Sequence, residues 1–371
     1  MQNRTHRLPC IDGLRALSVL SVILCHYRLL SSEPSSPMAT QVTFYLGRPL
    51  GVLCFFVISG FLITHLLRIE LERTSHISLR NFYIRRVLRI FPPMYLYLGI
   101  VVLLKLLGEI PLGIPNFIAA LFFLSDYTCF FLPESSSDWV IAHFWSLSVE
   151  EQFYFLWPLA FLLLKPRKAA ILCFIIIGLS PILRFATYFL FVEQRSYLTS
   201  MLHCTADPLL IGCLLALLAQ GARFNLILNQ CSYSLYPTAA FGILLLVSPL
   251  LVLAAGNYYW FSLGIPLNSA AVAFLISWFI RYPSSRVGVL LESRPFRYLG
   301  QRSYGLYLWQ ELILSNYFDG TWLAITPINF CTILLIAEFS YQTVERPLIK
   351  LRSRYRKKNE ANLESHYEPK C

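Results

Sequence analysis

Residues 155–191 read FLWPLAFLLLKPRKAAILCFIIIGLSPILRFATYFLF, two apolar runs on either side of the basic cluster Lys165-Pro166-Arg167-Lys168. The second run, 169–191, has the roughly 20 residues that an α-helix needs to cross the hydrocarbon core of a bilayer, and the first approaches this length when it is extended back to residue 147. The cluster between them is long enough only for a tight loop, so we predict two membrane-spanning helices that meet there. Because Lys and Arg accumulate in cytoplasmic loops, the cluster also predicts that this loop is cytoplasmic.

The composition of the whole chain agrees with this interpretation. Of its 371 residues, 56% are apolar and only 14% are charged, whereas roughly 25% are charged in an ordinary soluble domain. The net charge of +11 would suit nucleic-acid binding, but the basic residues stand in short clusters between apolar runs, as in membrane proteins. No polar linker divides the chain, so we expect one membrane domain.

We therefore expect an all-α, polytopic integral membrane protein with about ten transmembrane helices. They are predicted near residues 11–30, 48–67, 92–108, 147–164, 169–191, 197–219, 233–253, 262–280, 303–319 and 323–343. The remaining apolar segment, 116–132, is expected to be re-entrant or interfacial, because an eleventh crossing would place the Lys165–Lys168 cluster outside. In this arrangement 25 of the 31 Lys and Arg residues lie on one side, which predicts that both termini are cytoplasmic.

The first expected helix contains three ionisable residues, each of which costs at least about 2.5–3.5 kcal/mol in a membrane. Arg15 and His26 return within about 20° of the same helix face, and Asp12 lies within about 60° of Arg15. This polar stripe must face a protein interior or a wet cavity. Two interpretations stay open: Asp12 and Arg15 form a structural i,i+3 pair, or they are functional. His26, about 16 Å beyond Arg15, either bonds a carbonyl or acts as a general base towards a hydroxyl.

Two further clusters carry charge. Arg86 and Arg89 lie one helical turn apart before Pro92, where they either anchor the cytoplasmic end or bind the phosphates of a cytoplasmic cofactor. Glu150 and Glu151 are predicted at the outer entrance of the helix 147–164. They either complement the helix dipole, or orient a histidine, or bind sugar hydroxyls.

Further polar residues lie in the expected helices, and of these Glu345 is interpreted as mostly structural. Asp207 interrupts the helix 197–219, Glu338 lies in the last helix, and Glu345 with Arg346 looks like a helix-terminal ion pair. Small residues around Gly60 predict close helix packing. The cysteines show no C-x-x-C pair, so neither a disulfide framework nor a metal site is expected. No Walker A, H-E-x-x-H or G-x-S-x-G motif supports a soluble-type chemistry.

A series of short motifs resembles the membrane acyltransferase 3 family in order and over nearly the whole chain. They are IDGLRAL (11–17) followed by His26, FFVISGFLI (55–63), Arg86 and Arg89 with Pro92, WSLSVEEQFY (145–154), ADPLLIG (206–212), SYGLYLW (303–309) and VERP (344–347). The resemblance implies a bacterial inner-membrane enzyme that O-acylates carbohydrates such as lipopolysaccharide O-antigen, exopolysaccharide or peptidoglycan. Its donor would be a cytoplasmic acyl-CoA.

The resemblance also implies roles for residues. The family's essential histidine corresponds to His26, its first-helix arginine to Arg15, and its R-x-x-R pair to Arg86 and Arg89. Gln310 stands where the family often has histidine, so a role for that position is open. Many members carry a C-terminal hydrolase-like domain, whereas only about 28 polar residues follow the last expected helix. We therefore expect acyl transfer to finish within the membrane domain.

The expected protein has an acyltransferase domain over residues 1–346 and a polar, basic cytoplasmic tail over 347–371. It would be an O-acetyltransferase with acetyl-CoA as donor, a glycan as acceptor, contacts with membrane lipid, and neither a metal nor a nucleic-acid partner. The residues assigned to catalysis are His26, Glu150 and Glu151; to the donor, Arg15, Arg86 and Arg89; and to other intramembrane positions, Asp12, Asp207 and Glu345.

Two other functions stay open. A transporter or flippase for a lipid-linked sugar would also carry intramembrane charges but would perform no covalent chemistry. A lipid-linked glycosyltransferase would be expected to show an Asp-rich metal site towards the cytoplasm, whereas the loops here are rich in arginine.

Overall fold

The computed structural model of the chain describes residues 8–30, 37–131, 138–318 and 320–350; the side chains of residues 27–49 and 316 are not described. These residues form helices and no strand, so the all-α class is confirmed for them. The α-helices are α1 (Pro9–Leu30), α2 (Pro37–Thr74), α3 (Leu79–Leu106), α4 (Ile114–Leu121), α5 (Thr128–Phe131), α6 (Trp139–Ala142), α7 (Phe144–Leu190), α8 (Leu202–Thr205), α9 (Asp207–Leu218), α10 (Ala222–Gln230), α11 (Leu235–Gly242), α12 (Ser248–Tyr259), α13 (Ile265–Arg281), α14 (Arg286–Leu291), α15 (Arg294–Gln301), α16 (Ser303–Ile313) and α17 (Ile328–Ser340). Shorter turns include η1 (Ser125–Tyr127) and η7 (Tyr341–Glu345).

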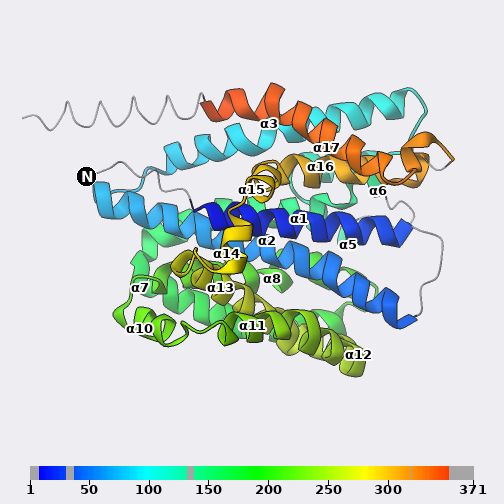
Figure 1. Ribbon diagram of the computed structural model, residues 1–371. Coiled ribbons are helices and arrows are strands. Elements are labelled where there is room, and N and C mark those ends of the chain that lie inside the picture. Colours follow the sequence, from blue (N-terminus) through cyan, green and yellow to red (C-terminus); the bar gives the residue numbers. More distant parts are fainter. Residues whose placement is uncertain (1–7, 31–36, 132–137, 319, 351–371) are drawn as a thin grey trace, which may run out of the picture.

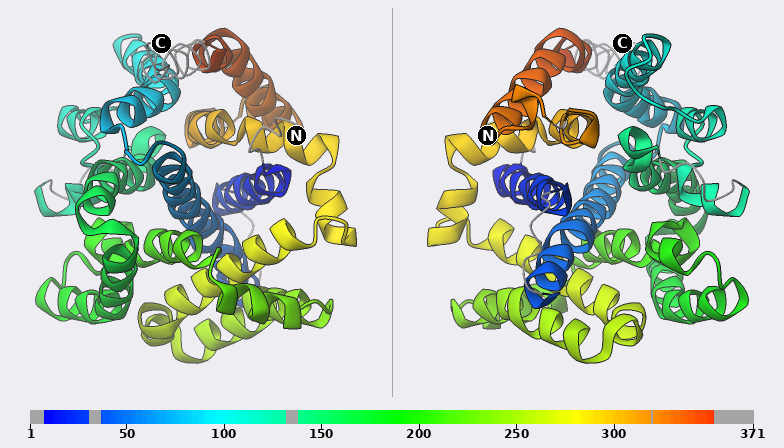
Figure 2. Two further views of the ribbon diagram at one scale, coloured as in Figure 1. Left: turned by 90° about the vertical axis from the view of Figure 1, so that its left-hand side faces the viewer. Right: turned by 90° about the vertical axis from the view of Figure 1, so that its right-hand side faces the viewer.

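Helix α1 runs through the middle of the bundle (Figures 1 and 2). It packs against α2 along one side and against α14, α15 and α16 on others. Helix α2 in turn packs against α9, and α7 and α13 pack against α9. The end-on views in Figure 2 show α3, α16 and α17 above α1 and α2, with α7, α9 and α13 on the opposite side. The polar face of α1 is therefore enclosed by protein, as its charges require.

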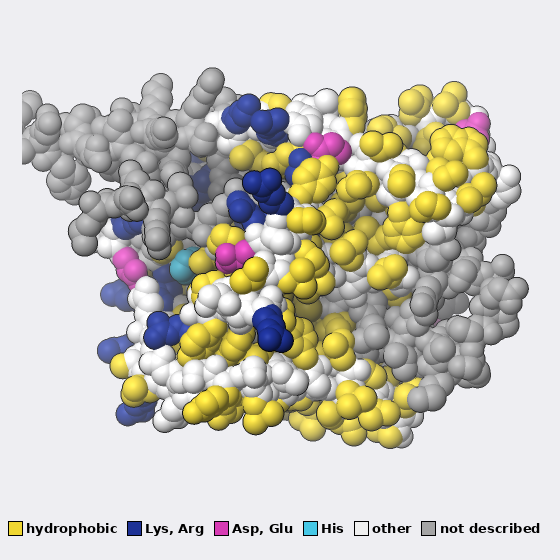
Figure 3. All heavy atoms as spheres, in the orientation of Figure 1, with side chains coloured by type: hydrophobic (Ala, Val, Ile, Leu, Met, Phe, Trp, Pro, Cys, Tyr) yellow, Lys and Arg dark blue, Asp and Glu magenta, His cyan; other side chains and the backbone are white. Residues whose placement is uncertain are grey.

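The surface is that of a protein solvated by lipid. Large apolar side chains point outward from α3, α7 and α12, among them Leu103, Leu163 and Leu190, which are 54%, 73% and 74% exposed. In Figure 3 the Lys and Arg side chains of the visible face gather over its left half, and the right half is mainly hydrophobic. This separation along the bundle is the charge asymmetry that the loop composition predicts.

The predicted count of about ten transmembrane helices is not confirmed. Among the described residues, five helices are long and apolar enough to cross a membrane, or six if the bent pair Asp207–Leu218 and Ala222–Gln230 is one span. The expected helices 147–164 and 169–191 both lie in α7, which is interrupted at Lys165 by a non-helical backbone (φ 60°, ψ 164°). The expected helices 233–253 and 262–280 lie in one segment that is interrupted at Gly256.

Two other expected helices are shorter than predicted, and the last one is shifted along the chain. The expected helix 197–219 becomes α9, which starts only at Asp207 because Pro208 favours the first turn of a helix. The expected helix 303–319 becomes α16, with 11 residues. The last expected helix, 323–343, begins at Ile328, and its helical backbone continues from α17 through η7 to Lys350. The segment 116–132 forms α4, η1 and α5, none of which is among the candidate spans.

Two close contacts hold the centre of the bundle together. A Cβ atom on Gly60 of α2 would lie 1.8 Å from the carbonyl oxygen of Leu209, and one on Gly212 of α9 would lie 2.1 Å from that of Val57. The backbones of α2 and α9 therefore touch, as the small residues of the sequence predict.

The second contact is an ion pair inside the bundle. Arg184 of α7 donates to both carboxylate oxygens of Asp207 at 2.9 and 3.0 Å, and both side chains are fully buried. Arg184 also donates to the carbonyl oxygens of Cys204 and Phe261. The intramembrane charge of Asp207 is thus satisfied by a structural partner, which joins α7 to the start of α9.

Candidate active site

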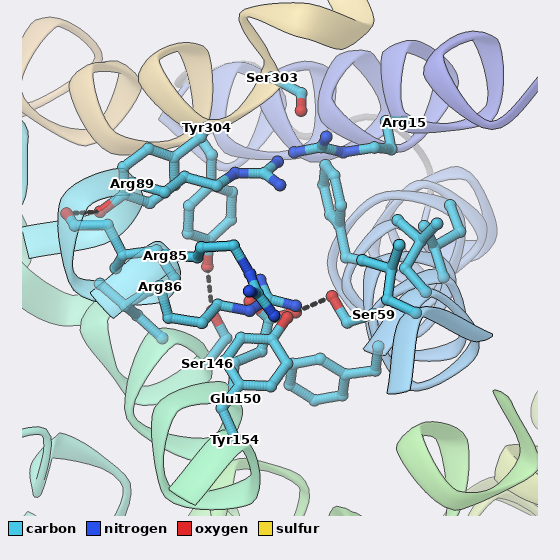
Figure 4. A pocket seen from close by; sticks show the side chains of 18 of the residues that line it. Arg15, Ser59, Arg85, Arg86, Arg89, Ser146, Glu150, Tyr154, Ser303 and Tyr304 are labelled. Atoms are coloured by element: carbon cyan, nitrogen blue, oxygen red, sulfur yellow. Dashed lines mark hydrogen bonds between the residues drawn. The ribbon is translucent and has the colours of Figure 1, made fainter. Parts of the chain in front are cut away.

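A cavity of about 130 Å³ lies where α1, α2, α3, α7 and α16 meet. Its polar lining consists of Arg15, Ser59, Arg85, Arg86, Arg89, Ser146, Glu150, Tyr154, Ser303, Tyr304 and Tyr307, and we call it the arginine pocket. In Figure 4 Arg15 and Arg89 extend towards each other near Ser303, and Arg86 lies closer to Tyr154. Residues that the sequence predicts to bind the donor are thus brought together from two different helices.

Helix α3 supplies the arginines because of where it begins. Its N-cap is Ser78, whose hydroxyl accepts from the backbone N–H of Asn81. Arg86 and Arg89 follow two turns later on one face of the helix. The guanidinium of Arg86 lies 3.9 Å from the centre of the Tyr154 ring, a cation–π contact. Arg85, which also lines the pocket, is engaged in an ion pair with Glu70 at 3.2 Å.

One carboxylate, Glu150, lines the pocket, and a second, Glu345, interacts with its arginines without lining it. Glu150 accepts a hydrogen bond from Ser59 at 2.5 Å and interacts electrostatically with Arg86, Arg15 and Arg89. Glu345 is 4% exposed and interacts with Arg89 and Arg15. The expected ion pair of Glu345 with Arg346 is therefore wrong, since Arg346 donates to Gln342.

The expected place of Glu150 and Glu151 is also wrong. Neither marks an outer entrance near His26, because Glu150 lines the arginine pocket beside residues predicted at the cytoplasmic end. Glu151 faces a neighbouring groove of about 470 Å³ that shares Arg86 and Tyr154 with the pocket. Helix α7 begins at the fully buried Phe144, and its following turns carry Glu150 and Tyr154 into contact with Arg86.

His26 does not line the arginine pocket and lies in a second site. Its side chain is 4% exposed, and its Nδ1 is 3.5 Å from Oε1 of Glu311, which is 2% exposed. The edge of Trp139 packs on its ring at 5.8 Å, and His143 is near enough to interact electrostatically. We call His26, His143 and Glu311 the histidine site.

Sequence reasoning missed both partners of His26. Glu311 follows the SYGLYLW motif in an apolar helix, and the cost of a carboxylate in such a helix is a signal that could have identified it. His143 precedes WSLSVEEQFY and is 2% exposed. Neither can be assigned to His26 from the sequence, because α1, α6 and α16 meet only in the folded chain.

Tyr307 stands between the two sites. It lines the arginine pocket, and its hydroxyl is 2.5 Å from the hydroxyl of Ser146 and donates to the carbonyl oxygen of His143. Its ring also meets the His143 ring edge-on at 5.5 Å. The two sites are therefore neighbours separated by aromatic side chains. Among the described residues no group of three or more His, Cys, Asp or Glu side chains is arranged to hold a metal ion.

Comparison with known proteins identifies the family. The family model described as an acyltransferase domain matches residues 8–339, and these residues contain both sites. The chain belongs to the acyltransferase 3 family. The resemblance found in the motifs is confirmed, and the acyltransferase domain accounts for nearly the whole chain.

Several curated proteins are similar to this chain along most of its length. The O-acetyltransferase OatA of Staphylococcus aureus is 31% identical over 369 residues, which cover 92% of this chain and 57% of OatA. The peptidoglycan O-acetyltransferase OatA of Listeria monocytogenes is 30% identical, with 92% and 56% covered. The putative peptidoglycan O-acetyltransferase YrhL of Bacillus subtilis is 30% identical, with 92% and 55% covered. The chain thus spans little more than half the length of these relatives. No solved structure matches it.

Proposed function

We propose that this protein is a membrane O-acetyltransferase that moves an acetyl group from cytoplasmic acetyl-CoA to a hydroxyl of a cell-surface glycan. The observation that carries the proposal is the pairing of a pocket lined by Arg15, Arg86 and Arg89 with a buried histidine further along the central helix that also carries Arg15. Arginine binds phosphate in a bidentate manner, and CoA carries several phosphates. The basic loops favour a position of the arginine pocket towards the cytoplasm, where acyl-CoA is found.

In this mechanism Arg86 and Arg89 hold the phosphates of CoA, with Arg15 at the inner start of the polar stripe. The pantetheine arm would then follow α1 for the roughly 16 Å between Arg15 and His26. An acceptor hydroxyl reaches His26, whose neutral imidazole removes its proton. The oxygen attacks the thioester carbonyl carbon, so that a C–O bond forms and the C–S bond breaks. His26 returns the proton to the departing thiolate of CoA.

The names of the relatives support peptidoglycan as the glycan, since two of the three are called peptidoglycan O-acetyltransferases. We accordingly place the protein in the bacterial cytoplasmic membrane, with both termini in the cytoplasm and the acceptor reaching His26 from the outer side. Both the charge asymmetry of the loops and the position of His26 in the far half of α1 favour this orientation.

Membrane vesicles with the cytoplasmic face outward test the function directly. Their lumen is loaded with a peptidoglycan fragment or its lipid-linked precursor, and acetyl-CoA labelled in the acetyl group is added outside. We expect free CoA to appear together with label on the glycan, at equal amounts. A transporter or flippase would instead move the sugar without releasing CoA, and that outcome would refute the proposal.

A further inference from the structure

Glu311 is a buried carboxylate outside the arginine pocket, to which the mechanism above gives no role. It lies in α16, with 2% of its surface exposed, among buried apolar residues such as Leu308 and Leu312. A carboxylate in such surroundings is costly and is kept where it has a partner or a function. Its Oε1 lies 3.5 Å from Nδ1 of His26, on the central helix.

Side chains from α3, α6 and the start of α7 surround the pair of His26 and Glu311. Trp139 of α6 packs edge-on against the His26 ring at 5.8 Å, and His143 interacts with His26 from the start of α7. Tyr97 of α3 interacts electrostatically with Glu311 and meets the His143 ring edge-on at 5.6 Å. Glu311 is the carboxylate that faces His26 among the described residues, since Glu150 and Glu345 interact with the arginines beyond Tyr307.

The geometry points to different roles for the two imidazole nitrogens of His26. A neutral imidazole carries one proton, and a carboxylate at Nδ1 favours the tautomer in which Nδ1 is protonated. Nε2 then keeps its lone pair for an incoming hydroxyl. When Nε2 takes the proton, the carboxylate stabilises the imidazolium inside a site of low polarity. A separation of 3.5 Å without substrate is compatible with this, because such contacts often tighten only in the reacting complex.

We propose that Glu311 is the positioning residue of His26: it fixes the histidine tautomer and offsets the positive charge that forms on the ring during acetyl transfer. This inference rests on the proposed role of His26 as the base. It assigns to Glu311 the part that the sequence suggested for Glu150 and Glu151.

The test compares Glu311→Gln and Glu311→Asp with the unchanged protein, using acetyl transfer from labelled acetyl-CoA in membranes. Glu193→Gln, which makes the same chemical change in an exposed turn, is the matched control. We expect Glu311→Gln to lower kcat by at least ~100-fold, with KM for acetyl-CoA within about twofold, because the donor is held in the arginine pocket. Glu311→Asp keeps the charge and should recover at least about a tenth of kcat.

Two further measurements keep the outcomes apart. Size-exclusion profiles and melting curves of the purified variants show whether Glu311→Gln is folded. If Glu311→Gln is not folded, the test rests on Glu311→Asp. A folded Glu311→Asp protein that has lost its kcat would then contradict the inference. His26→Ala serves as a reference, and the double variant His26→Ala/Glu311→Gln should be no slower than His26→Ala. If His26→Ala is inactive while Glu311→Gln keeps full kcat, the inference fails and the proposed function stands. If His26→Ala itself keeps full activity, the proposed mechanism fails.

Discussion

Arg15, Arg86 and Arg89 bring three positive charges into one cavity, where they interact with Glu150, and Arg15 and Arg89 also interact with the nearby Glu345. Guanidinium groups that face one another repel, and the carboxylates offset this repulsion until an anion enters. In Figure 4 the arginines are arranged around the cavity and are not turned away from it. Such a site is preorganised for a ligand with several negative charges, and only small side-chain movements are needed to receive it.

At the residue scale we predict that Arg86→Ala and Arg89→Ala each raise KM for acetyl-CoA by about 10-fold or more, because a charge-assisted hydrogen bond contributes roughly 1.5–3 kcal/mol. The reaction step at saturating donor should change much less. Arg80→Ala removes the same charge from an exposed position on the same helix and is the control. Steady-state kinetics with varied acetyl-CoA measure both constants. An unchanged KM in both variants would contradict the binding of acetyl-CoA in the arginine pocket.

A second residue-scale prediction concerns the buried pair Arg184 and Asp207. Replacing one partner leaves an uncompensated charge among apolar side chains, so Asp207→Ala should cost about 3–5 kcal/mol of stability. The double variant Arg184→Met/Asp207→Leu should lose clearly less than the sum of the single variants. Melting curves of the purified proteins in one detergent compare them. Additive losses would mean that the two side chains do not act as a pair.

At the element scale the fold depends on the contact between α2 and α9. A Cβ atom at Gly60 or Gly212 would overlap a backbone oxygen of the other helix, which cannot move without moving the helix. We predict that Gly60→Ala lowers stability by about 1–3 kcal/mol and reduces activity, because Ser59 next to it binds Glu150. Gly178→Ala is the control, since nothing lies within 4 Å of its added carbon. A Gly60→Ala protein as stable as the unchanged one would contradict this packing.

The elements also show which features of the fold the sequence could predict. Apolar length and basic clusters predicted helices in the main apolar regions, and the described residues are helical there. They also predicted the break at Lys165, where a non-helical backbone (φ 60°) separates the helical stretches on either side of the basic cluster. They could not predict how short α16 is, because helical turns that protein covers can be as apolar as turns that face lipid.

At the scale of the whole molecule, some features of the candidate site could also be predicted from the sequence and others could not. Arg15, Arg86, Arg89 and His26 could be identified one by one, because each charge is costly in its own helix. Their grouping could not, since it depends on which helices meet. Glu150 joins the arginines, whereas Glu311, near the other end of the chain, joins His26. Contacts of this kind arise from tertiary packing and leave no local pattern in the sequence.

The molecule as a whole combines two sites on one central helix, the arginine pocket and the histidine site, with aromatic side chains between them. In the proposed mechanism the arginine pocket binds the cytoplasmic donor, and the histidine site performs the chemistry nearer the opposite face. Because the two roles are separate, donor affinity and transfer rate can be lost independently.

His26→Ala tests this mechanism most directly, through acetyl transfer from labelled acetyl-CoA to glycan and donor binding measured on the same membranes. We predict that donor affinity stays within about twofold of the unchanged protein, because His26 lies outside the arginine pocket. The transfer rate should fall by about 10²–10⁴-fold, the usual contribution of a general base. A His26→Ala protein that transfers acetyl at the unchanged rate would contradict the mechanism.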